Sequence, residues 1–180
     1  MARAFFVAAG LAMFATTAPA DALRLYSYDP ANAETKAAAG PLTFEFRQGL
    51  LRTTMVAVRA TEAQATADLK SANERDIGPA GLTPLIGAGA PERDLYEVKP
   101  DQDGAALIAA FCPGATRAWM AFGKPRLYRD LRVYVLGPSD GGGPVRLCRT
   151  FDFSFHGAWR APAGRGVTPD ITPRSPLPRY

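Results

Sequence analysis

The sequence contains only two cysteines and one histidine among its 180 residues, and this scarcity excludes the common metal and redox sites. A metal site built on Cys112 and Cys148 would need two further ligands, and the single histidine, His156, cannot supply both. The two cysteines lie 36 positions apart in the sequence, so they do not form a CxxC redox pair. We therefore expect no metal ion and no cofactor.

The patterns of well-known catalytic sites are also missing. There is no G-x-S-x-G motif, which places the nucleophilic serine of many hydrolases on a sharp turn. Asp152, Ser154 and His156 alternate along one predicted strand, but the first and the last would lie about 13 Å apart at ~3.3 Å per residue. A catalytic triad needs these groups within hydrogen-bonding reach. We therefore expect a structural histidine and assign no catalytic residue.

Long apolar runs are absent apart from residues 4–14. This run follows Arg3 and precedes the small residues A-P-A at 18–20, which is the order typical of a secretory signal peptide. It is too short for a transmembrane helix, which needs about 20 apolar residues. We predict a signal peptide over residues 1–20, with an alternative end at Ala22. A periplasmic or secreted protein with no transmembrane segment after signal removal is expected.

The chain has little excess charge once its C-terminal part is set aside. The formal net charge is +4, but residues 160–180 alone carry four arginines and one aspartate. This segment is rich in proline and has no apolar period, so we expect a disordered tail. Residues 23–159 are nearly neutral and are expected to form a single domain. A nucleic acid is therefore not an expected partner.

Export gives the two cysteines a structural meaning. In an oxidising compartment a lone pair of cysteines tends to form a disulfide. We predict a bond between Cys112, at the end of a predicted helix, and Cys148, inside a predicted strand. Closing a loop of this length stabilises a folded chain by about 4 kcal/mol in the chain-entropy model.

Apolar periodicity divides the domain into short elements. Strands are predicted at 23–28, 42–46, 50–60, 95–99, 116–122, 130–136 and 145–155, and helices at 31–39 and 104–112. The helix at 31–39 is expected to begin after an N-cap at Asp29. For residues 61–76 the signals conflict, because Thr61 and Gln64 have capping-box spacing while Ala65, Ala67 and Leu69 alternate as in a strand. Residues 78–94 are dense in glycine and proline and predict an irregular loop.

The last three predicted strands are joined by short connections and should form an antiparallel meander. Phe151, Phe153 and Phe155 share one face of the last strand, which predicts a core. Cys148 falls on the polar face and Arg149 on the apolar face, so either a bulge reverses the phase or a helix covers part of the second face. The fold class predicted is α+β: a mainly antiparallel sheet of about six strands, with this meander, one or two packed helices and one disulfide.

The second face of the meander is the candidate binding surface. Simple register would group Arg117, Trp119, Arg132, Tyr134 and Arg146 on it. Planar cations beside aromatic rings can hold an anionic small molecule, a glycan or an acidic segment of a protein. The plainer interpretation is a solvated face on which arginine stems cover the aromatic rings.

These observations predict an exported protein whose role is non-enzymatic binding or structural interaction. The alternative is an envelope-associated hydrolase whose site the sequence does not reveal. A closed polar cleft with converging acidic groups would favour the enzyme, and an exposed arginine-rich or aromatic surface would favour the binding protein.

Overall fold

The computed structural model describes residues 22–48, 53–101, 103–139 and 142–162. The strands are β1 (Ala22–Pro30), β2 (Leu42–Gln48), β3 (Thr53–Ala60), β4 (Ala65–Ser71), β5 (Asp94–Val98), β6 (Ala118–Phe122), β7 (Leu131–Pro138) and β8 (Val145–Pro162). The helices are α1 (Ala33–Ala38), α2 (Thr83–Ile86) and α3 (Gly104–Phe111), with one turn of 3-10 helix, η1 (Glu74–Ile77). The predicted signal peptide and most of the predicted tail lie outside the described residues.

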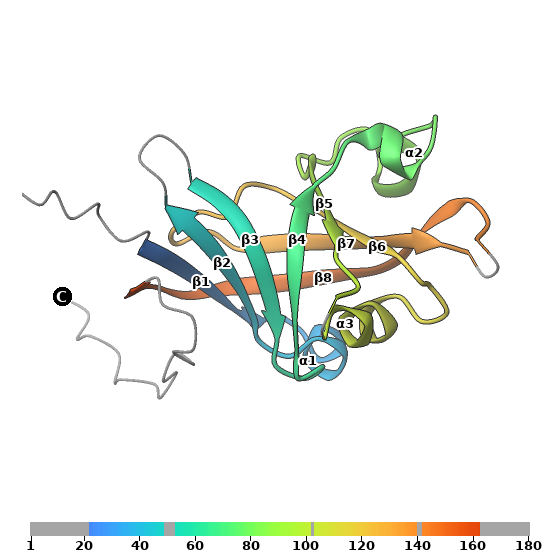
Figure 1. The fold of residues 1–180 in the computed structure, drawn as a ribbon. Coiled ribbons are helices and arrows are strands. Elements are labelled where there is room, and N and C mark those ends of the chain that lie inside the picture. Colours follow the sequence, from blue (N-terminus) through green and yellow to red (C-terminus); the bar gives the residue numbers. More distant parts are fainter. Residues whose placement is uncertain (1–21, 49–52, 102, 140–141, 163–180) are drawn as a thin grey trace, which may run out of the picture.

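The strands form a closed antiparallel barrel in which each strand pairs with its neighbours in sequence. β8 closes the barrel, because its second half pairs with the whole of β1 (Figure 1). Tyr28 pairs with Phe155, for example. The α+β fold with about six strands is therefore wrong. Two causes explain the error: residues 65–71 form a strand, and the closure joins two segments that no local pattern connects.

Residues 65–71, part of the segment with conflicting sequence signals, form the strand β4. Ala65, Ala67 and Leu69 are buried in the barrel interior, and Asp68 between them is exposed. Pairing of β4 with both β3 and β5 therefore overrides the capping-box spacing of Thr61 and Gln64, which lie in the preceding turn. Residues that alternate between core and solvent satisfy a strand but not a helix.

The interior of the barrel is filled with aromatic and aliphatic side chains. Phe44 lies 5.1 Å from Phe122 between ring centroids, and Tyr96 stacks on Phe122 at the same distance. Phe151 and Phe153 of β8 are both 1 % exposed, as the predicted core requires. An eight-stranded barrel has an interior about wide enough for its own side chains, and this barrel fills that space with packed rings.

β6, β7 and β8 pair antiparallel in sequence order, as part of the closed barrel and not as a separate meander, and a bulge accounts for the irregular phase of β8. Val135 pairs with Arg149 and Leu136 pairs with Leu147, which leaves Cys148 as an extra residue in β8. Of the two explanations offered by the sequence, the bulge is the correct one. β8 also continues beyond the predicted domain end at residue 159, because Arg160 pairs with Arg24 of β1.

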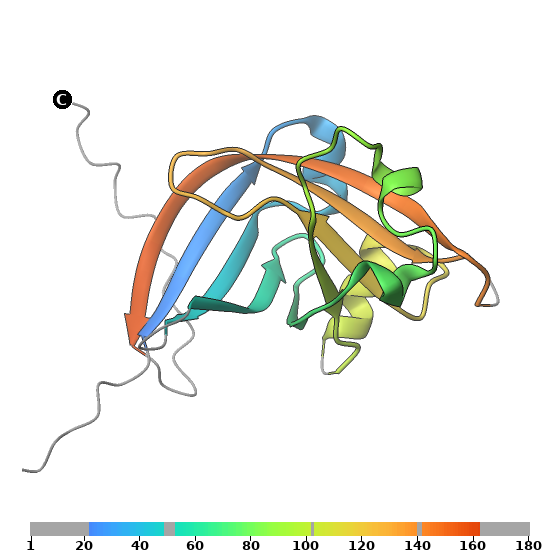
Figure 2. The same cartoon turned by 90° about the horizontal axis from the view of Figure 1, so that it is seen from above.

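The two predicted helices are present, although α1 begins later than expected. Its N-cap is Asn32, whose side chain accepts a hydrogen bond from the backbone N–H of Thr35 at 2.8 Å. The expected cap, Asp29, lies in β1 instead. α1 and α3 both lie at the end of the barrel where β1 ends and β8 begins, and the view from above separates them (Figures 1 and 2).

The long connection between β4 and β5 packs on the outside of the barrel. This connection includes η1 and α2, and its Ile77 and Leu82 form a second apolar cluster with Leu95, Trp119 and Leu136 of the neighbouring strands. The glycine and proline content predicted irregular structure here, and η1 and α2 are the only helical turns that the structure shows between residues 72 and 93. This connection therefore covers part of the outer face of β5, β6 and β7, whereas Arg132 of β7 stays exposed.

Candidate functional site

The structure does not bring the predicted binding face together as one exposed surface. Trp119 is 2 % exposed, because the connection with η1 and α2 covers it. Arg117 donates to Glu97 at 2.7 Å and its guanidinium lies 4.8 Å from the Trp119 ring centroid. This arginine therefore caps a buried ring and is already paired with a carboxylate, as in the plainer interpretation of this face.

The other predicted residues also have partners inside the protein. Arg132 donates to Asp152 at 2.6 Å across the β7–β8 pair, and this hydrogen bond raises the pKa of the guanidinium above its ordinary value. Tyr134 is half-buried against the outer apolar cluster. Arg146 lies on the far side of the bulge and donates to the carbonyl of Pro113 at 3.3 Å, so it belongs to a different surface.

A free strand edge lies where β8 extends past β1. β1 pairs with β8 only from Phe153 to Pro162, so Val145 to Asp152 have a strand neighbour on the β7 side alone. At Asp152, the last of these positions, α1 and the residue Ala31 before it take the place of β1. The N–H of Ala31 donates to the carbonyl of Asp152 at 2.9 Å, and the N–H of Asp152 donates to the hydroxyl of Thr35 at 3.2 Å.

Strand geometry determines which backbone groups point out of this edge. Asp152 directs both its N–H and its carbonyl toward α1. Because these groups alternate along a strand, Thr150 directs its N–H and carbonyl the same way. No described residue supplies a backbone partner to Thr150 on that side. The edge is thus able to accept one more extended segment at this position.

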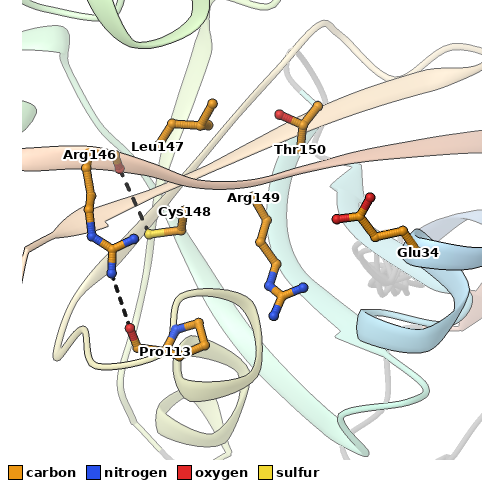
Figure 3. A pocket seen from close by; sticks show the side chains of 7 residues that line it. All are labelled: Glu34, Pro113, Arg146, Leu147, Cys148, Arg149 and Thr150. Atoms are coloured by element: carbon orange, nitrogen blue, oxygen red, sulfur yellow. Dashed lines mark hydrogen bonds between the residues drawn. The ribbon is translucent and has the colours of Figure 1, made fainter.

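The edge borders an open surface hollow of about 580 Å³. Five consecutive residues of β8 line the hollow, together with Glu34 of α1 and Pro113 after α3: Arg146, Leu147, Cys148, Arg149 and Thr150. Figure 3 shows the side chain of Arg149 extending from β8 into the space between α1 and α3. A second hollow, lined by alanines of α1 and α3 and by Glu62, shares Glu34 and Arg149 with the first.

Arg149 directly follows the bulge and keeps the phase of Phe151 and Phe153 in the rest of β8. It pairs with Val135, whose side chain is fully buried in the barrel, so it has the phase of an interior residue. At this end of β8 a side chain with the interior phase points into the hollow and not into the barrel core. Its guanidinium makes no ion pair or hydrogen bond with another described residue. The position of Arg149 on the predicted apolar face of the strand was therefore the one feature of the sequence that indicated this site.

The disulfide fixes the far side of the hollow. Cys148 of the bulge is bonded to Cys112 at the end of α3, with the two Cα atoms 5.2 Å apart. Gly137 of β7 leaves room for this bond, since a Cβ there would lie 2.5 Å from the sulfur of Cys112. The bond holds Pro113 next to the edge, so the shape of the hollow is set before any ligand arrives.

A separate candidate site is the pair of Asp29 on β1 and His156 on β8, which lies on the outer surface of these strands. Nδ1 of His156 is 2.7 Å from a carboxylate oxygen of Asp29, and the imidazole stacks on the ring of Trp159. The sequence did not reveal this pair, because Asp29 was expected to cap a helix. Ser154 is on the neighbouring register position, but no hydrogen bond joins its hydroxyl to the imidazole in the described structure.

Among the described residues no helix is both long and apolar enough to span a membrane. Within the same residues no three histidine, cysteine or acidic side chains cluster as metal ligands would. No family model, no curated protein and no solved structure matches the chain. The candidate site therefore stands on its geometry alone.

Proposed function

We propose that the protein is a non-enzymatic binding domain that receives an extended, acidic segment of a partner protein along the free edge of β8. The single observation that carries the proposal is the combination at Thr150 and Arg149. An outward-pointing backbone donor and acceptor stand next to an arginine without a partner in the described structure. In strand addition, main-chain hydrogen bonds provide affinity and neighbouring side chains provide selectivity.

The shape of the site favours a protein segment over a small molecule. Sites for small molecules are usually concave and bury most of the ligand surface, whereas this hollow is open to solvent along the strand. The barrel interior is filled by a cluster of buried side chains. A segment running along β8 would instead be held by repeated backbone contacts.

The charges near the edge favour an acidic segment. Arg146 and Arg149 face the hollow on β8, and Glu34 is the one acidic residue that lines it. A carboxylate placed over Arg149 can form a charge-assisted, bidentate pair. A lysine at the same position of the partner would be repelled.

Bulges and charged side chains also protect exposed strand edges from aggregation. This protective role and the binding role predict different results with an added peptide. An edge that is only protected rejects every extended peptide, while a binding edge discriminates by sequence.

The experiment is a titration of the ¹⁵N-labelled protein with a peptide of about eight residues, the length of a strand, in which valine and glutamate alternate. We expect the amide resonances of Arg149 and Thr150 to shift and the amide of Thr150 to become protected from solvent exchange. Two matched peptides serve as controls. One has lysine in place of glutamate, and the other has a central proline, which cannot complete a strand ladder. Shifts at β8 that are equal for all three peptides, or absent for all, would contradict the proposal.

A hydrolase is the second candidate, because Asp29 orients the imidazole of His156 in the way that a general base requires. It is less well supported, since the described structure provides no hydroxyl or thiol bonded to that imidazole. A periplasmic or secreted location belongs to the same proposal. The disulfide supports it, because such bonds persist in oxidising compartments.

A further inference from the structure

We propose that the loop between β6 and β7 docks the protein on an anionic lipid surface. This loop, residues 123–130, lies at the end of the barrel opposite α1 and α3, so the inference is independent of the β8 edge (Figure 1). Two observations carry it. The turn of the loop exposes two apolar side chains, and the cations around them have no internal partners in the described structure.

The apolar side chains are Leu127 and Tyr128, which are 48 % and 86 % exposed. A ring with so little cover projects from the surface, and neither of the two hollows includes it. Tyr128 also has a backbone φ of 58°, a left-handed conformation that a bulky side chain rarely adopts. Its ring packs edge-on against Phe155 of β8 with 5.5 Å between centroids, so it is held in place rather than free to fold back.

Three exposed cations, Lys124, Arg126 and Arg129, surround these two residues. None of them makes an ion pair or a side-chain hydrogen bond with another described residue. Asp130 is the one acidic residue of the loop, and its carboxylate accepts a hydrogen bond from the backbone N–H of Phe155 at 3.2 Å. The loop therefore presents a net positive charge around an apolar tip.

A convex tip of this kind fits a lipid surface better than a protein or nucleic acid partner. Tyrosine is favoured at the boundary between headgroups and acyl chains, where its ring is buried and its hydroxyl stays wet. Basic side chains next to the tyrosine are attracted to anionic headgroups, and their aliphatic stems can extend along the boundary. A nucleic acid would use the cations but would have no need of Leu127. A protein partner would be expected to bind an apolar patch that is flatter than this convex tip.

The test measures co-sedimentation of the full chain with vesicles of phosphatidylcholine alone and of phosphatidylcholine mixed equally with phosphatidylglycerol. We expect binding to the anionic vesicles only, weakened by added salt. The variant L127S/Y128S should bind at least about tenfold more weakly, since it removes the apolar contact. The variant K124Q/R126Q/R129Q should bind about 100-fold more weakly, since each basic residue near an anionic surface contributes about fivefold.

A matched variant separates the loop from charge in general. K36Q/K70Q/R75Q removes three exposed cations elsewhere on the protein. It should bind within about threefold of the wild type, because it does not touch the loop. Failure of the wild type to bind anionic vesicles at low salt would overturn the proposal. So would equal losses in K124Q/R126Q/R129Q and in the matched variant. Binding to a single-stranded oligonucleotide that survives L127S/Y128S, without vesicle binding, would identify a polyanion partner instead.

Discussion

Cys148 occupies the extra position of the β8 bulge, and its bond to Cys112 joins the end of α3 to the strand that closes the barrel. The bond spans 36 positions of sequence. We expect the oxidised protein to have no free thiol and the variant C112A/C148A to lose about 4 kcal/mol of unfolding free energy. Urea titration without reductant gives the free energies, and mass measurement after alkylation counts the thiols. A double variant as stable as the wild type would show that the bulge and α3 hold together without the bond.

Phe153 and Ser154 are adjacent in β8 but point to opposite sides of the barrel wall. Phe153 is 1 % exposed, whereas Ser154 is exposed. Phe153→Ala should cost about 3 to 5 kcal/mol, because it leaves a cavity among packed rings. Ser154→Ala should cost less than about 0.5 kcal/mol. Equal effects of the two substitutions in a urea titration would contradict the inward phase of this strand.

Tyr28 is fully buried, and its hydroxyl has no hydrogen-bond partner among the described residues. Burial raises the pKa of Tyr28 to about 12. The unfolded chain releases this proton near pH 10, while the folded protein keeps it until about pH 12, so the unfolding free energy falls as the pH rises through this window. At neutral pH both states are protonated and the group has no such effect.

The variant Tyr28→Phe isolates this contribution. It should be as stable as the wild type or more stable at pH 7, because it removes a buried hydroxyl that lacks a partner. Above pH 10 it should retain about 2 kcal/mol more of the unfolding free energy than the wild type. Urea titrations of both proteins from pH 8 to pH 11.5 would follow the difference. A difference that does not grow with pH would mean that Tyr28 titrates normally.

Leu82 seals the outer apolar cluster over Trp119, and it is fully buried. The sequence contains two tryptophans, so in a W159F background the fluorescence reports on Trp119 alone. We expect a blue-shifted emission that acrylamide hardly quenches. Leu82→Ala should cost about 2 to 5 kcal/mol and open the ring to quencher. Strong quenching before the substitution would show that the connection between β4 and β5 does not cover the barrel.

Local periodicity was sufficient for most strands but not for the closed barrel. Of the alternating phenylalanines of β8, Phe151 and Phe153 are buried as predicted and Phe155 is partly buried, and Arg149 on the apolar face correctly indicated an irregularity. In contrast, the pairing of Tyr28 with Phe155 joins segments far apart in the sequence, and register between such segments has no local signal. The burial of Trp119 depends on a long connection whose path follows from tertiary packing. The five residues of the predicted arginine face do not form one exposed surface, because β8 changes phase at Cys148 and the connection between β4 and β5 covers Trp119.

The central claim is that the free edge of β8 binds an acidic strand through Arg149. Fluorescence anisotropy with the labelled valine–glutamate peptide tests it most directly, using R149Q and the matched variant R75Q, which removes an exposed arginine on η1. The account predicts that R149Q weakens binding about tenfold or more, as expected for the loss of a charge-assisted pair, and that R75Q binds like the wild type. Equal affinities of R149Q and R75Q for this peptide would contradict it.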